Sequence, residues 1–151
     1  EGNAIWLDKN KTSSYELYQF FLNVEDCMVI DYLKKYTFLS KEEIDKLAES
    51  TEKEPEKRLA HKTLAKEIVT FLHGEEAYEE AINITNSLFS GNIKNLSSKE
   101  IMQAFKGLEA YEIAEAKNII DLLVESKICS SKREAREFVQ NGSIYINGEK
   151  K

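Results

Sequence analysis

Basic side chains gather near the end of the sequence, in a pattern that could hold a chain of phosphates. Ten residues carry four basic groups and one acidic group: Lys127, Lys132, Arg133, Arg136 and Glu134. On a helix, four cationic or amide side chains would share an arc of about 100°: Lys132, Arg133, Arg136 and Gln140. The apolar Ala135, Phe138 and Val139 would share another side. Such a helix could rest on a small core and direct its guanidinium and ammonium groups at phosphates.

The net charge of the chain supports binding of phosphate only in this last part. The total is −6, which would repel phosphate if it were evenly spread. Residues 1–118 carry 15 Lys and Arg against 22 Asp and Glu, a net charge of −7. Residues 119–151 carry six against five, a net charge of +1. We therefore expect any nucleic acid to meet the C-terminal residues.

The turn after the basic helix fits the same chemistry. Asn141-Gly142 should end the helix, and the glycine would let a ribose-phosphate chain come close to backbone N–H groups. Aromatic residues are not interleaved with the cations, apart from Tyr145, so recognition of backbone and shape fits better than base stacking. A solvated helix face without a ligand would carry similar charges, and the residues alone leave both interpretations open.

Other groups of residues indicate neither catalysis nor a metal. His61 and His73 lie twelve positions apart on one expected helix, which turns them about 120° from each other, so they do not share the face that zinc needs. The carboxylate pairs at 42–43, 75–76 and 79–80 suit the first turns of helices better than general acid and base work. Glycine-rich phosphate loops and serine elbows are absent from the sequence, so we expect no catalytic residue and no metal ligand.

The composition indicates a folded protein of a reducing compartment. Of 151 residues, 42% are hydrophobic and one is proline, which excludes the disordered and collagen-like classes. The sequence has neither an apolar stretch of roughly 20 residues nor the pattern of a signal peptide, so we expect a soluble, cytoplasmic protein. Cys27 and Cys129 lack CxxC spacing, and we expect two buried thiols in preference to a disulfide or metal site.

The spacing of apolar residues predicts helices over most of the chain. Four Ser-x-x-Glu capping boxes mark helix starts, at Ser13, Ser40, Ser97 and Ser131. A further helix is expected at about 25–36. Pro55 should open the longest apolar stripe, which ends at Gly74, and a second stripe from Ala77 to Phe89 should end at Gly91. These two stripes predict an antiparallel pair of helices.

The helical period fades at 107–117, where we expect a linker. Beyond it, apolar residues at 119–123 and the basic helix predict a small unit of its own. Residues 143–148 alternate and end in Asn-Gly, which indicates a β-hairpin, although only three residues remain for the returning strand. The expected fold class is mainly α, a helical bundle followed by a small α+β unit with a truncated hairpin.

Several short strings, in their order and spacing, resemble those of bacterial tyrosyl-tRNA synthetases. Towards the end of the chain the strings resemble the RNA-binding S-four-like domain: Leu-Leu-Val at 122–124, Ser-Lys-Arg-Glu-Ala-Arg at 131–136, Asn-Gly at 141–142 and Ile-Tyr-Ile-Asn-Gly-Glu at 144–149. Upstream strings resemble the C-terminal half of such an enzyme: 2–7, 14–21, 60–67 and His-Gly-Glu-Glu-Ala at 73–77. The resemblance runs along the whole chain.

The resemblance implies a parent tyrosine–tRNA ligase that activates tyrosine with ATP and Mg²⁺ and transfers it to its tRNA. This chain would be the C-terminal, tRNA-binding portion, without the catalytic domain, without a cofactor of its own and inactive alone. Its partner would be the tyrosine tRNA and not a membrane, and the parent would be a homodimer through the catalytic domain. The implied domains are a remnant at 1–12, a helical anticodon-binding domain at 13–106, a linker at 107–117 and a partial S-four-like domain at 118–151.

The RNA-binding motif of the family can be carried over to single positions of this sequence. The expected contacts are Lys127, Ser131, Lys132, Arg133, Arg136, Gln140 and Gly142. Arg133 and Arg136 would clamp phosphates, and Gly142 would permit close backbone approach. The alternative is a helical protein-interaction module without RNA binding, in which the stripes at 60–72 and 77–89 pack against a partner protein.

Overall fold

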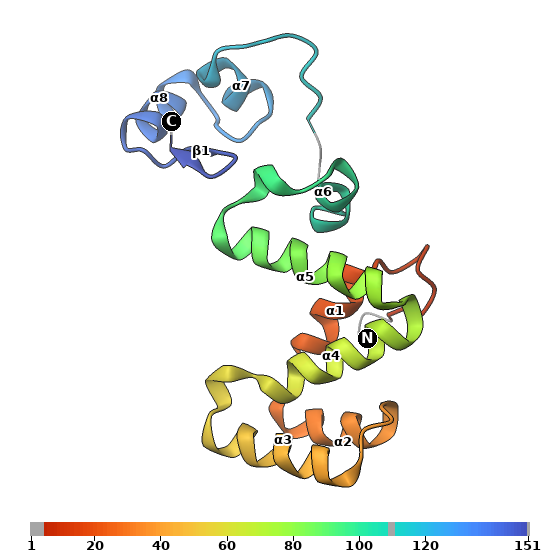
Figure 1. Cartoon of the computed structure of the whole chain (residues 1–151). Coiled ribbons are helices and arrows are strands. Elements are labelled where there is room, and N and C mark those ends of the chain that lie inside the picture. Colours follow the sequence, from red (N-terminus) through yellow and green to blue (C-terminus); the bar gives the residue numbers. More distant parts are fainter. Residues whose placement is uncertain (1–4, 109–110, 151) are drawn as a thin grey trace.

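The structure is a computed structural model that describes residues 5–108 and 111–150. Helices dominate it, and Figure 1 shows a larger helical unit joined by an irregular segment to a smaller unit with a hairpin. The elements of the larger unit are α1 (Ser14–Leu22), α2 (Asp26–Tyr36), α3 (Lys41–Lys53), η1 (Pro55–Lys57), α4 (Leu59–His73), α5 (Glu75–Ser90), η2 (Ile93–Asn95) and α6 (Ser98–Ala104). The smaller unit holds α7 (Ile119–Glu125), α8 (Lys132–Gln140), β1 (Tyr145–Ile146) and β2 (Glu149–Lys150). The mainly α fold class with a short hairpin is confirmed.

Capping boxes begin three of the helices, as predicted. At α1 the Ser13 hydroxyl accepts from the Glu16 N–H at 3.2 Å, and the Glu16 carboxylate accepts from the Ser13 N–H at 2.7 Å. The same reciprocal pairs open α3 at Ser40 and α6 at Ser97. Each box satisfies two backbone donors that a helix start would otherwise leave without a partner.

The core of the larger unit forms around α4, which packs against α1, α2, α3 and α5. Fully buried apolar side chains come from α1, α2, α4 and α5 and include Leu17, Val29, Leu33, Leu64, Val69, Ala81 and Ile84. Figure 1 shows α1 lying between α4 and α5. The antiparallel contact of α4 with α5 agrees with the expected helical pair.

Pro55 does not open the long helix, contrary to the prediction. It begins the short η1, and Arg58 then takes a left-handed backbone conformation with φ of 48°, so that α4 starts only at Leu59. The Arg58 guanidinium donates to the Leu22 carbonyl at 2.8 Å, which ties the start of α4 to the end of α1. This long-range hydrogen bond leaves no mark in the local sequence pattern.

The phase of the apolar stripe on α5 also differs from the prediction at its end. Phe89, expected on the buried side, is 86% exposed, whereas Ile84 is fully buried. Ile84 follows Ala77 and Ala81 at helical spacing, so the buried face rotates slightly as the helix proceeds.

The two cysteines differ in burial. Cys27, expected to be buried, lies exposed near the start of α2, whereas Cys129 is buried as expected. Both thiols are free.

The two histidines of α4 hold neighbouring segments in place. His61 is 1% exposed, and its Nε2 lies 3.2 Å from the Val24 carbonyl and 3.1 Å from an Asp26 carboxylate oxygen. Burial lowers the pKa of His61, and the nearby Arg58 charge lowers it further against the opposing pull of Asp26. His73 bridges the Leu7 carbonyl and the Ser14 hydroxyl, each at 2.9 Å.

The smaller unit has a separate core of three buried side chains: Leu123, Cys129 and Ala135. Its hairpin is antiparallel, with Tyr145 opposite Lys150 and Ile146 opposite Glu149. Asn147 and Gly148 form the two-residue turn with φ of 52° and 81°, the positive values that favour Asn-Gly at such turns. In the part of the chain that the structure describes, no helix is long and apolar enough to cross a membrane.

Candidate nucleic-acid interface

The packing of α8 on α7 decides which side chains of α8 face solvent. Ala135 is fully buried against the second core, and Val139 packs against the same core half-buried. Because these apolar residues lie on one side, the helix exposes its other sides, which carry Lys132, Arg133 and Arg136. We call the α8 side chains Lys132, Arg133, Arg136 and Gln140 the basic stripe; all four are exposed.

The start of α8 differs in detail from a full capping box. The Ser131 hydroxyl accepts from the Glu134 N–H at 3.3 Å, as expected. The Glu134 carboxylate, however, accepts from the Ser130 N–H at 2.7 Å and from its hydroxyl at 2.6 Å. These hydrogen bonds lower the pKa of Glu134. The only acid among the cations of 127–136 is therefore held at the helix start, and the Ser131 hydroxyl keeps its own proton for a further acceptor.

One member of the basic stripe is engaged within the chain. Lys132 Nζ lies 2.7 Å from a carboxylate oxygen of Asp121 on α7. The hydrogen bond and charge of Lys132, together with the charge of Arg136, lower the pKa of Asp121. Asp121 therefore stays ionised and competes with any phosphate that would bind Lys132.

The remaining cations form no ion pair with an acid of the described residues, although the charge of Arg136 still acts on Asp121. Within the described residues, the side chains of Lys127, Arg133 and Arg136 make no ion pair and no hydrogen bond, and all three are exposed. Lys127 lies in the connection between α7 and α8, where its backbone has a φ of 62°. Such a conformation is uncommon for a lysine, and no feature of the sequence indicated it.

The turn after α8 does not offer the free backbone donors that its sequence suggested. The Asn141 N–H donates to Glu137 at 2.9 Å, the Gly142 N–H to Val139 at 3.0 Å, and the Ser143 N–H to Phe138 at 2.9 Å. These bonds follow the usual closure of a helix end, which satisfies its last carbonyl groups. The prediction that this turn offers free backbone N–H groups is therefore wrong for Asn141, Gly142 and Ser143.

Gly142 makes room for a cation that the sequence reasoning missed. A Cβ on Gly142 would overlap the end of the Lys150 side chain, and the φ of 63° at Gly142 also disfavours other residues. The hairpin thus brings the Lys150 ammonium beside the turn that ends α8, far from the expected contacts in sequence. The sequence feature that could have indicated this position of Lys150 is the Asn-Gly turn, because that turn sets the hairpin register and places Lys150 opposite Tyr145.

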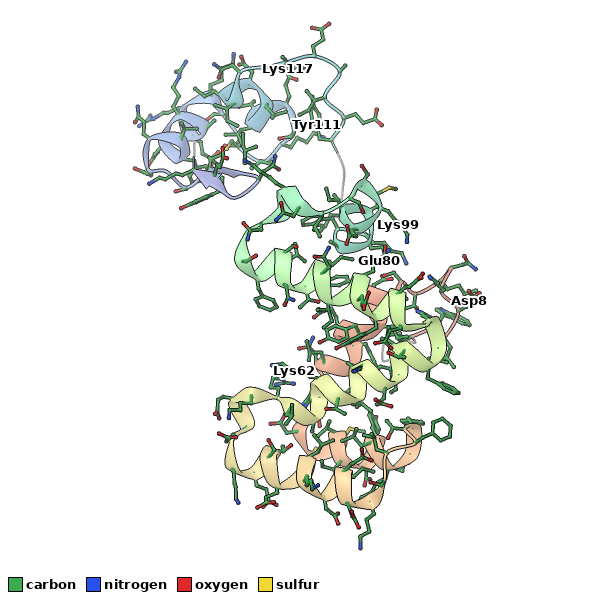
Figure 2. The ribbon with its side chains drawn as sticks, viewed as in Figure 1. Asp8, Lys62, Glu80, Lys99, Tyr111 and Lys117 are labelled. Carbon is green, nitrogen blue, oxygen red and sulfur yellow. The ribbon has the colours of Figure 1, made fainter. Side chains whose placement is uncertain are left out.

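The segment before α7 is fastened to that helix through Glu125. The Tyr111 hydroxyl donates to the Glu125 carboxylate at 3.0 Å, and Lys117 pairs with the same carboxylate. Figure 2 labels Tyr111 and Lys117 on this segment. The two donors lower the pKa of Glu125, while the pKa of Tyr111 is raised. Lys117 is consequently occupied and is not part of the exposed cationic surface.

Cations of the larger unit also pair with its acids. Lys99 lies 2.8 Å from Glu80, a pair labelled in Figure 2, and Lys106 lies 3.0 Å from Glu16. No three Asp, Glu, His or Cys side chains come together as metal ligands anywhere in residues 5–108 and 111–150.

Two family models match different parts of the chain, and the second begins within α6 of the larger unit. A model described as "tRNA synthetases class I (W and Y)" matches residues 1–90. A model described as "Tyrosine--tRNA ligase SYY-like C-terminal domain" matches residues 100–151. The second match includes α7, α8 and the hairpin, and so contains the whole basic stripe.

Curated relatives and solved structures agree with these matches. The chain is 53% identical to tyrosine–tRNA ligase 1 of Bacillus licheniformis over 100% of its length, and 55% identical to the tyrosine–tRNA ligase of Streptococcus pneumoniae strain CGSP14 over 99%. It spans 36% of the length of each relative. A C-terminally truncated mitochondrial tyrosyl-tRNA synthetase of Aspergillus nidulans superposes with a TM-score of 0.55 at 43% identity, over 58% of this chain and 26% of that one. The corresponding enzyme of Coccidioides posadasii gives a TM-score of 0.52 at 43% identity, over 55% and 23%.

Proposed function

This chain belongs to the tyrosine–tRNA ligase family, and from that premise we propose that it binds the tyrosine tRNA. In this proposal residues 13–106 form a helical anticodon-binding domain, 107–117 a linker, and 118–151 an S-four-like domain that contacts the sugar-phosphate backbone. Residues 1–12 would follow the catalytic part of the protein. The observation that carries the proposal is the set of exposed cations on and beside α8 that no acid of the described chain occupies.

The basic stripe would act by replacing the counterions of the RNA. Each phosphate neutralised by a lysine or arginine releases bound cations, so the affinity falls as salt rises, with a slope of about −0.9 per contact on duplex. Lys127, Arg133 and Arg136 can bind phosphates without breaking an ion pair, whereas Lys132 can do so only if it leaves Asp121. The arginines can bind two phosphate oxygens each, whereas Gln140 and the Ser131 hydroxyl offer neutral hydrogen bonds.

The ATP-dependent reaction of the whole ligase belongs, in this proposal, to other parts of the protein. The whole enzyme would join tyrosine to its tRNA with ATP and Mg²⁺, as a class I synthetase. The described residues do not fit that chemistry, because they bring no three metal ligands together and the sequence has no glycine-rich phosphate loop. We therefore propose no catalytic residue in this chain, and dimerisation of the whole enzyme through its catalytic domain. The cytoplasm is the proposed location.

Titration of the chain with purified tyrosine tRNA tests this function. The expected result is saturable binding that is tighter than for an unrelated tRNA and weakens by between one and two orders of magnitude from 50 to 200 mM salt. A helical protein-interaction module would bind both tRNAs equally poorly, with little response to salt. Pyrophosphate exchange with tyrosine and ATP should show no turnover by this chain alone.

A further inference from the structure

The two units of the chain touch at the tip of the hairpin. Figure 1 shows the hairpin beside the turn that follows α5. At this point the backbones of Gly148 and Gly91 meet so closely that a Cβ on Gly148 would overlap the Gly91 carbonyl oxygen. Gly91 ends α5 with a φ of 74°, and Gly148 has a φ of 81° in the hairpin turn. The absence of a side chain at Gly148 therefore allows an approach to the Gly91 backbone that a larger residue at 148 would prevent, whereas a Cβ on Gly91 would meet nothing within 4 Å.

An ion pair lies beside this backbone contact. Lys94 in η2 pairs with Glu149, the residue after Gly148. The surroundings are polar, because a shallow cavity of about 270 Å³ between the units is lined mainly by hydroxyl, amide and charged side chains with two glycines: Ser90, Gly91, Asn92, Lys94, Asn95, Asn147, Gly148 and Glu149. A polar contact with an exposed ion pair is weak and reversible compared with a packed core.

Little else in the structure fixes how the units are oriented. The two apolar cores share no residue. The described residues of the connecting segment, 107–108 and 111–117, form neither helix nor strand. The direction in which the basic stripe points, relative to the helical unit, is consequently set by the hairpin contact, whereas Glu125 only holds the last part of the connecting segment on α7.

We propose that the Gly91–Gly148 contact and the Lys94–Glu149 ion pair form a latch that holds the two units in one orientation for tRNA. This inference rests on the proposed function. The latch residues are positioning residues, which need not touch RNA themselves. With the latch closed, the helical unit and the basic stripe are presented to one tRNA together, so the second contact forms at high effective concentration. When the latch is weakened, only the molecules that are still closed present both units to one tRNA. The apparent affinity is then the affinity of the closed form multiplied by the fraction of molecules that are closed.

The distance between the units tests the latch without RNA. The exposed Cys27 on α2 can carry one spin label and Glu137→Cys on α8 a second, since Cys129 is buried. Pulsed electron resonance should give a narrow distance distribution for this otherwise unchanged chain. Glu149→Lys and Lys94→Glu should each broaden it, and the combined exchange of both charges should narrow it again.

The glycine contact has a matched control. Gly148→Asn keeps a residue that tolerates positive φ but adds a Cβ against Gly91, so it should broaden the distribution. Gly107→Asn makes the same change at a similar φ of 87°, where nothing lies within 4 Å of the added Cβ, and should leave the distribution narrow. A distribution that stays narrow in Gly148→Asn and in both charge variants would overturn the latch.

Binding of tyrosine tRNA by the same variants tests the positioning role. Glu149→Lys adds positive charge, so a simple charge effect would strengthen binding, whereas a latch that stays closed in only about a tenth of the molecules would weaken it about tenfold. The charge exchange should recover the affinity. Broadened distances with unchanged or improved affinity would overturn the role in positioning. If the chain without these substitutions bound no tRNA, the proposed function would fail. The distances between the spin labels would still decide whether the latch exists.

Discussion

Asp121→Asn should strengthen the binding of tyrosine tRNA. The Asp121 carboxylate holds Lys132 at 2.7 Å and also lies in the field of Arg136. Asparagine keeps the size of the side chain but removes the charge, so Lys132 becomes available to a phosphate. Since the side chain of Lys132 is 62% exposed and that of Asp121 43%, little folding stability depends on the pair, and the α7–α8 packing should persist.

The size of the effect follows from the number of available cations. Lys127, Arg133 and Arg136 alone predict a slope of log affinity against log salt of about −2.7, and the release of Lys132 makes it about −3.6. The slope should therefore steepen by about 0.9 in the variant. Affinity at 50 mM salt should rise several-fold, while the two curves approach each other at high salt.

Fluorescence anisotropy of labelled tRNA, from 50 to 300 mM salt, measures both quantities. Asp31→Asn is the matched control, because it removes the same charge from a surface pair with Lys35 on α2, in the other unit. The control separates a local effect at the basic stripe from a change in net charge. Two results would refute the assignment of Lys132 to a phosphate. One is the same salt slope for Asp121→Asn and for the unsubstituted chain, and the other is the same gain in tRNA affinity for Asp121→Asn and Asp31→Asn.

Three further outcomes are expected. Arg136→Ala should weaken tRNA binding about eightfold at 100 mM salt with unchanged helical circular dichroism, because its side chain is exposed and off the apolar face; a loss of helix would instead show a structural role. Leu123→Ala should destabilise the smaller unit by about 2–5 kcal/mol, enough to unfold it separately, and calorimetry should then show the transition of the larger unit unchanged; a single shifted transition would contradict two separate cores. Because the pKa of His61 is lower in the folded chain than in the unfolded chain, the unfolded chain binds more protons as pH falls below about 7. Stability to urea should therefore fall between about pH 7 and 5 and should fall less in His61→Gln; equal slopes would exclude His61 as the cause.

Local sequence chemistry predicted the helix starts and the hairpin well. Ser13, Ser40 and Ser97 satisfy donors within their own first turns, so four residues contain the whole reason for each helix start. The Asn147-Gly148 turn is equally local, because positive φ at two successive residues is enough to set the hairpin register. The exposed basic side of α8 followed from helical spacing, but Phe138, predicted on the apolar side with Ala135 and Val139, is 37% exposed.

The features that the sequence did not reveal depend on contacts between different elements of the fold. Arg58, at the end of η1, reaches the Leu22 carbonyl 36 positions away. Lys132 is ion-paired because α7 brings Asp121 to it, and the space where Gly142 lacks a side chain is taken by the end of Lys150. Neither neighbour could be assigned before the packing of α7, α8 and the hairpin was known, and these neighbours decide which cations are available to a ligand.

The most direct test of the account is the map of backbone amide shifts on adding purified tyrosine tRNA to the isotope-labelled chain. The account predicts the largest changes at Lys127, along 131–142 and at Lys150, with smaller ones on the helical unit. Large changes confined to the helical unit, with the amides of α8 unmoved at saturation, would contradict the claim that the basic stripe binds RNA.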